Sequence, residues 1–84
     1  MPKSIFSVGQ EKLQDLLKKS RIATGLTQVE LARMLKRPQS FVSKYESGER
    51  RLDLIELREI CKALNSPLSK FIKNFEESLL DKEN

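Results

Sequence analysis

The sequence contains no histidine or tryptophan, one cysteine, and only three glycines and three prolines. It has no cysteine cluster, no acidic cluster with metal-ligand spacing, and no glycine-rich loop of the kind that cradles phosphates. We therefore expect neither an enzyme nor a bound metal or other cofactor. The single Cys61 excludes an internal disulfide and is typical of a reducing cytoplasm. Because it falls on the apolar face of a predicted helix, we interpret it as a buried small hydrophobic residue and not as a redox sensor.

Long hydrophobic runs are also missing. No apolar run approaches the length of a membrane span, and the opening stretch, MPKSIFSVGQ, lacks the apolar core of a signal peptide. These absences predict a soluble, cytoplasmic protein with no membrane partner. The 84 residues predict a single domain over 1–84, too small to enclose a large substrate pocket or to add an effector domain. We accordingly expect no small-molecule ligand.

The net charge of +4 is unevenly distributed along the chain. Residues 1–26 carry five basic and two acidic side chains, and residues 27–52 carry six basic and three acidic ones. Residues 53–84 carry five basic and seven acidic side chains, so the last part of the chain is negative. Such a division is typical of a molecule with one side for a nucleic acid and another for protein contacts.

Proline and glycine occur only where helices would begin or end, and no segment alternates polar and apolar residues with period two. Both observations predict an all-α fold with five helices. The first helix covers about 9–24, the second follows Thr27, the third runs between Pro38 and Gly48, the fourth extends from Asp53 to about Leu64, and the fifth covers about 67–80.

Two of the expected helix starts have the spacing of a capping box, Thr27 with Glu30 and Asp53 with Glu56. Helical periodicity then selects the side chains that should face the core. The expected core positions are Leu13, Leu16, Leu17 and Ile22 in the first helix, Leu31, Ala32, Met34 and Leu35 in the second, and Leu54, Leu57, Ile60, Cys61 and Leu64 in the fourth.

Residues 27–51, TQVELARMLKRPQSFVSKYESGERR, predict two short helices joined by a tight turn. At about 100° per residue, the second of these helices divides into two faces. Its polar face consists of Gln39, Ser40, Ser43 and Lys44. Its apolar face consists of Phe41, Val42 and Tyr45. The polar face thus offers an amide, two hydroxyls and an ammonium, which are groups that hydrogen-bond to base edges and phosphates in a DNA major groove.

Four pieces of the chain match one pattern: Gly25-Leu26-Thr27-Gln28, Glu30-Leu31-Ala32, Val42-Ser43-Lys44-Tyr45-Glu46 and Ser47-Gly48. In these motifs the chain resembles the Cro/phage-repressor type of helix-turn-helix found in XRE-like bacterial regulators, over about 13–75. The resemblance implies a compact five-helix, Cro/repressor-like domain in which helices 2 and 3 form the motif at about 27–48. A small Ala32 would let these helices cross closely. Lys36 occupies the turn position that usually carries Gly or Asn, because the chain there is left-handed.

The resemblance also implies roles for individual side chains, with the second motif helix lying in the major groove. The base-contacting residues would be Gln39, Ser40, Ser43 and Lys44. The phosphate-contacting residues would be Gln28, Lys36, Arg37, Arg50 and Arg51. A carboxylate that faces phosphate is repelled, so we expect Glu46 to be structural and to pair with an arginine such as Arg21.

One recognition helix covers only a few base pairs, so a homodimer on a palindromic operator is expected. The fifth helix carries an apolar stripe at helical spacing that could serve as the dimer element, although part of it must cover the domain's own core. The expected interface residues are Phe71, Ile72, Phe75, Leu79 and Leu80. Ile5, Phe6 and Val8 are also apolar and could join this interface.

The sequence thus predicts a sequence-specific, DNA-binding transcriptional regulator that acts as a repressor. A controller of a restriction system would be one form of it, with endonuclease and methyltransferase genes nearby. Two alternatives stay open. An antitoxin would also bind DNA but would have a toxin as its protein partner, encoded beside it. An accessory regulator would act mainly through a protein partner and would bind DNA without sequence preference.

Overall fold

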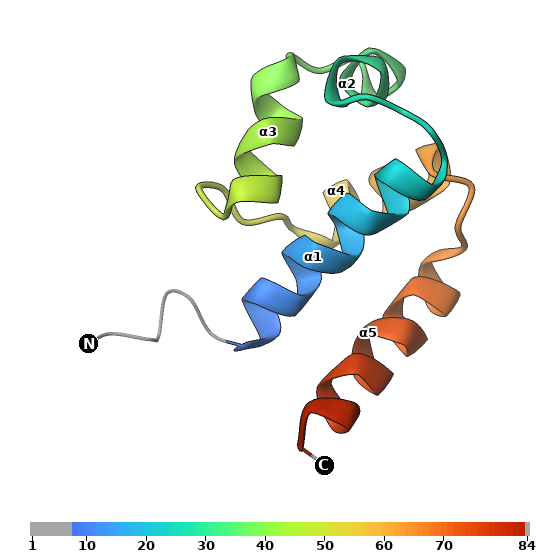
Figure 1. Cartoon of the computed structure of the whole chain (residues 1–84). Helices are drawn as coiled ribbons and strands as arrows, with labels where there is room; N and C mark the ends of the chain where they lie inside the picture. The colour runs from blue at the N-terminus through green and yellow to red at the C-terminus, as the bar shows by residue number, and fades with distance from the viewer. Residues whose placement is uncertain (1–7, 84) are drawn as a thin grey trace.

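The computed structural model describes residues 8–83, which form helices and turns without a strand (Figure 1). The helices are α1 (Val8–Ala23), α2 (Gln28–Leu35), α3 (Gln39–Ser47), α4 (Leu54–Ala63) and α5 (Leu68–Glu83). The all-α, five-helix prediction is therefore confirmed. Between residues 8 and 83, no helix is long and apolar enough to cross a membrane.

The helices pack in pairs that are close in sequence as well as pairs that are distant. α2 packs against α3 and α4, while α1 packs against α3 at one side and against α5 at the other. In Figure 1, α5 runs beside α1, and α2 and α3 lie together at the opposite end of the molecule. α3 is thus supported from behind by α1 and α2.

Both predicted capping boxes are present. The Thr27 hydroxyl accepts from the Glu30 backbone N–H at 3.0 Å, and the Glu30 carboxylate accepts from the Thr27 N–H at 2.9 Å. The same reciprocal pair joins Asp53 and Glu56 at the start of α4. α3 differs, because Pro38 occupies its N-cap position and provides no side-chain hydrogen bond. Local sequence therefore fixes the starts of α2 and α4 more firmly than the start of α3.

The turn between α2 and α3 depends on Lys36, which has left-handed backbone angles (φ 59°, ψ 42°). Its N–H donates to the carbonyls of Ala32 and Arg33, which closes the end of α2. The left-handed geometry expected at this position is confirmed, although the residue is neither Gly nor Asn. Gly48 ends α3 with a φ of 91°, a value that glycine adopts without strain.

The core is formed mainly by aliphatic side chains from all five helices. At the crossing of α2 and α3, Ala32, Val42 and Tyr45 are all buried. Among the residues whose burial is described, the buried hydrophobic ones are Leu17, Leu31, Ala32, Phe41, Val42, Tyr45, Leu57, Ile60, Cys61, Leu64 and Phe71.

Three predicted core positions are wrong. Ile22, Met34 and Leu54 are 57%, 53% and 62% exposed, respectively. Each lies in the first or last turn of its helix, and in α1 and α2 a neighbouring residue of the same turn, Arg21 or Leu35, is the more buried one. At the end of α1, the inward position is taken by Arg21, which is buried. Periodicity identifies a face, but it does not show how far along the helix that face remains covered.

Candidate nucleic-acid interface

α3 presents its polar side chains outward. Gln39, Ser40 and Lys44 are exposed and Ser43 is half-buried, whereas the apolar face of the helix is in the core. The structure thus brings together the four residues that the sequence assigned to base contact. The Ser43 hydroxyl donates to the Ser40 backbone carbonyl at 3.3 Å. The lone pairs of the Ser43 oxygen remain available to accept a hydrogen bond from DNA.

The buried side chain of Glu46 is held at the edge of the polar face of α3 by Arg21. The Arg21 Nε lies 2.7 Å from Glu46 Oε2, and its Nη2 lies 3.1 Å from Oε1. A third guanidinium bond reaches the Leu26 carbonyl at 2.8 Å. These hydrogen bonds with Glu46 raise the pKa of Arg21. The predicted pairing of Glu46 with an arginine is confirmed, and it joins α1, α3 and the loop before α2.

The same carboxylate positions two glutamines. Gln28 Nε2 donates to Glu46 Oε1 at 3.0 Å, which leaves the Gln28 carbonyl oxygen to accept from Gln39 Nε2 at 3.3 Å. A chain of polar contacts therefore runs from buried Arg21 through Glu46 and Gln28 to exposed Gln39. The first residue of α2 and the first residue of α3 are held side by side, and the N-terminus of each helix favours an anion.

Two of the three arginines expected at phosphates converge on one aromatic ring. The guanidinium carbons of Arg37 and Arg50 lie 4.4 and 5.0 Å from the centroid of the Phe41 ring. Both arginines also approach the Glu56 carboxylate: Arg50 Nη2 hydrogen-bonds Oε2, and Arg37 Nη1 lies 3.7 Å from the same oxygen. Lys36 and Arg51 are exposed, in the turn before α3 and in the loop after α3.

The pairing of Glu56 with Arg50 was not found by sequence reasoning. In the sequence, the spacing of Glu56 from Asp53 indicates a capping box and therefore a helix start, but it does not indicate an arginine partner. A second missed contact involves Gln14 of α1, whose side chain fills the space beside Gly48 at the end of α3. Its Nε2 also lies 3.4 Å from the Glu46 carbonyl. Both contacts depend on how separate elements meet.

The predicted dimer element on α5 is divided between the core and the surface. Phe71 is only 3% exposed and belongs to the core of its own domain, which corrects its expected place in a dimer interface. α5 packs against α1 and α4, and Phe71 is the residue of α5 that is buried in the core cluster. Phe75 and Leu79 are half-buried, and Ile72 and Leu80 are exposed. Ile5 and Phe6 lie outside the described residues, and Val8 is exposed.

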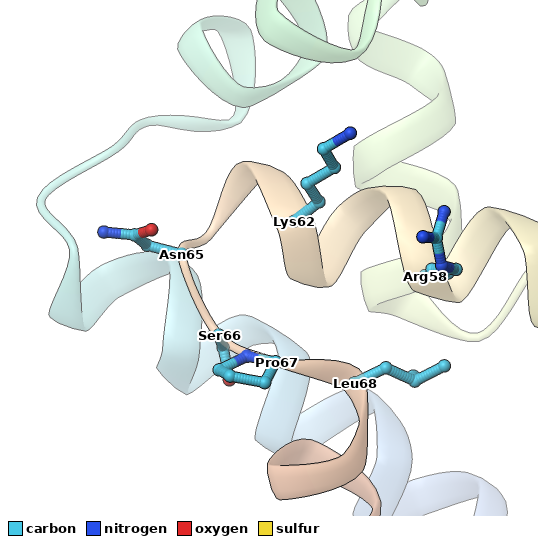
Figure 2. Close-up of a pocket in the computed structure, with 6 residues that line it drawn as sticks. All are labelled: Arg58, Lys62, Asn65, Ser66, Pro67 and Leu68. Carbon is cyan, nitrogen blue, oxygen red and sulfur yellow. The ribbon is translucent and has the colours of Figure 1, made fainter.

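A shallow hollow lies where α4 passes into α5 (Figure 2). Its volume is about 390 Å³, and Figure 2 shows Arg58 and Lys62 extending from α4 in the same direction. The remaining lining residues are Asn65, Ser66, Pro67 and Leu68. None of the residues on the polar face of α3 contributes to this hollow, which separates it from the candidate interface.

Comparison with known proteins decides the family. A helix-turn-helix family model matches residues 17–71, which includes the whole motif. An XRE-family-like protein from Pseudomonas syringae pv. tomato is 43% identical, with 90% of this chain and 93% of that chain aligned and a TM-score of 0.83. The chain belongs to the XRE-like helix-turn-helix family. The family and fold are those of DNA-binding transcriptional regulators and not of enzymes.

Two further solved structures resemble this XRE-family chain. The wild-type restriction-modification controller protein C.Esp1396I is 27% identical, with a TM-score of 0.80 over 88% of this chain and 97% of that one. The clp gene regulator ClgR from Corynebacterium glutamicum is 22% identical, with a TM-score of 0.78 over 90% and 81%, and shares the fold. A sequence comparison with curated proteins found no match.

Proposed function

We propose that this XRE-family regulator is a sequence-specific repressor that inserts α3 into the DNA major groove as a homodimer. The observation that carries the proposal is the outward polar face of α3, whose first residue, Gln39, is held by Gln28. The Gln39 amide can pair with adenine N6 and N7, and Lys44 can donate to guanine O6 and N7. Ser40 and Ser43 add hydroxyls between them.

Phosphate contacts would fix the position of this helix. Gln28 is the first residue of α2, so a phosphate there would meet the backbone N–H groups of the helix start as well as the Gln28 amide. Lys36 and Arg37 place cations before α3, and Arg51 places one after it. Such contacts orient a protein on the duplex but carry no sequence information. Arg50 was expected to contribute as well, but its guanidinium is engaged by Glu56 and is considered below.

A homodimer would place two such helices on a palindromic operator. The apolar side chains available for it are at the surface of α5 and at the start of α4, where Leu54 and Ile55 are both exposed. The α5 candidates are Ile72, Phe75, Leu79 and Leu80. Two copies that bury these residues would read half-sites about one helical turn apart. Repression needs only that the dimer occupy its operator.

The proposal is tested by selection from a random-sequence duplex library at near-physiological salt. Recovery of a palindrome with half-sites about one turn apart would support a dimeric, sequence-specific regulator. Salt-sensitive retention without an enriched motif would contradict it, because the basic side chains would then bind phosphate alone. Sedimentation of the Leu80→Lys variant beside Lys73→Glu, an exposed charge change on the same helix, tests the dimer. Only Leu80→Lys should yield a monomer.

The likeness to C.Esp1396I favours one particular setting, a restriction-modification controller. In that case endonuclease and methyltransferase genes would lie beside the regulator's own gene. Such neighbours, together with binding to DNA upstream of them, would support this setting. An operator elsewhere, with no such genes nearby, would contradict it and leave the general repressor proposal intact.

A further inference from the structure

We propose that Glu56 gives Arg37 and Arg50 different roles. It ties Arg50 to the fold as a structural residue and leaves Arg37 to bind a DNA phosphate. This inference rests on the proposed DNA-binding function and names which cations serve it. Its three residues come from the turn before α3, the loop after α3, and α4.

Glu56 is fixed in place. Its Oε1 accepts from the Asp53 N–H at 3.1 Å, and its own N–H donates to Asp53 Oδ1 at 2.7 Å. The side chain is 12% exposed. Because the carboxylate completes the capping box of α4, it cannot follow an arginine outward to a phosphate.

The two arginines are attached to Glu56 unequally, although their side chains are 36% (Arg37) and 39% (Arg50) exposed. Arg50 hydrogen-bonds Oε2 directly, and its Nε is buried with no hydrogen-bond partner among the described residues. Arg37 approaches the same oxygen only to 3.7 Å, beyond hydrogen-bonding distance. Leaving Glu56 would cost Arg50 a charge-assisted hydrogen bond, but would cost Arg37 only a screened attraction.

The charge balance leads to the same division. One carboxylate cannot neutralise two guanidinium groups, so this cluster keeps one surplus positive charge. The ring face of Phe41 attracts both guanidinium groups, so this contact does not distinguish Arg37 from Arg50. Because Arg37 is held more loosely than Arg50, its guanidinium is the one that can bind a phosphate.

The test measures how affinity for a random-sequence duplex depends on salt. In the wild-type background, Arg37→Ala should reduce the slope of log K against log salt by about one, and Arg50→Ala should leave it unchanged. Glu56→Gln keeps the capping box, because glutamine serves at that position, and releases Arg50. It should steepen the slope by about one, and adding Arg50→Ala should remove that increment.

Glu49→Gln is the matched control, since Glu49 is exposed, precedes Arg50 and loses the same charge. Its slope should equal that of the wild type. Equal slope losses for Arg37→Ala and Arg50→Ala, or equal increments for Glu56→Gln and Glu49→Gln, would overturn the inference. Absence of any salt-dependent binding by the wild type would instead overturn the proposed function.

Thermal unfolding, measured without DNA, tests this inference separately from the proposed DNA-binding function. Arg50→Ala should lower the Tm of the wild type more than it lowers the Tm of Glu56→Gln, because the tie to Glu56 has already been weakened in that variant. Arg37→Ala should lower both by similar amounts. Similar behaviour of the two arginines in thermal unfolding would show that Glu56 does not distinguish them.

Discussion

Arg21 and Glu46 form a buried two-point ion pair that joins the end of α1 to the end of α3. Its two nitrogen–oxygen distances are 2.7 and 3.1 Å, and the side chains are 10% and 3% exposed. The pair lies directly behind Gln28, so the ion pair that supports the fold also orients the first polar residue of the interface.

Removing one partner of this pair should be strongly destabilising. Arg21→Met or Glu46→Gln leaves a buried group without its partner and should lower the free energy of unfolding by about 3–5 kcal/mol. The double variant Arg21→Met/Glu46→Leu should recover much of that loss. Urea denaturation measures all three. Asp15→Asn, which breaks the exposed Asp15–Lys19 pair, should cost less than about 1 kcal/mol, and an equal cost there would refute the prediction.

Gln28 should act on specificity through Gln39. Gln28→Ala removes the oxygen that accepts from Gln39 Nε2, so the Gln39 amide loses its fixed orientation. We expect weaker binding and a broadened preference at the base pair that Gln39 reads. Because the two residues act together, the losses from Gln28→Ala and Gln39→Ala should not add in the double variant. Additive losses in a competition assay would show that the glutamines work independently.

The Tyr45 hydroxyl is buried and has no hydrogen-bond partner among the described residues. Removing it should relieve an unsatisfied polar group while leaving the ring contact with Phe41 in place. Tyr45→Phe should therefore raise the free energy of unfolding by about 1 kcal/mol in urea denaturation. A loss of stability would show that the hydroxyl has a partner in solution, such as a bound water.

Cys61 should make the fold sensitive to alkali. Burial raises the pKa of its thiol from 9.0 to about 11, so the unfolded chain loses the thiol proton first. The contribution of this thiol to stability should be constant below pH 9 and should fall between pH 9 and 11, by up to about 1.4 kcal/mol per pH unit. Burial also raises the pKa of Tyr45, which acts in the same direction.

The contribution of the thiol is isolated by comparison with Cys61→Ala. That variant should lose stability at neutral pH because it leaves a cavity, but its decline above pH 9 should be shallower than that of the wild type. Unfolding free energies measured across pH 7–10.5 decide the point. Parallel declines in the two proteins would mean that the thiol does not contribute.

Lys36 pays a conformational cost at the turn of the motif. A left-handed residue with a side chain is less stable there than glycine, so Lys36→Gly should raise the free energy of unfolding by about 1 kcal/mol. Lys62→Gly, the same change inside α4, should lower it by about 1 kcal/mol. Thermal unfolding tests both, and destabilisation by Lys36→Gly would indicate that the lysine side chain has a role in the turn.

The helices, their caps and the polar face of α3 could be predicted because each depends on residues close together in sequence. Thr27 and Glu30 are three residues apart, and the two faces of α3 follow from its period alone. The Arg21–Glu46 pair is distant in sequence, but it was expected on electrostatic grounds, because a carboxylate that faced phosphate would be repelled.

Other features could not be predicted because they depend on where chain segments meet. Phe71 is in the core because α1 and α4 cover the face of α5 on which it lies. Arg37 and Arg50 both reach Phe41 only because the loop after α3 folds back toward the turn before it. No periodic pattern encodes such a return.

α3 begins without a side-chain cap and is held by three buried residues on one side. Its outward Ser40, Ser43 and Lys44 therefore contribute little to the fold that displays them. Substitution at these positions can exchange one target sequence for another while the protein continues to fold. Newly duplicated copies of such a gene could diverge in the operators that they recognise without first losing stability.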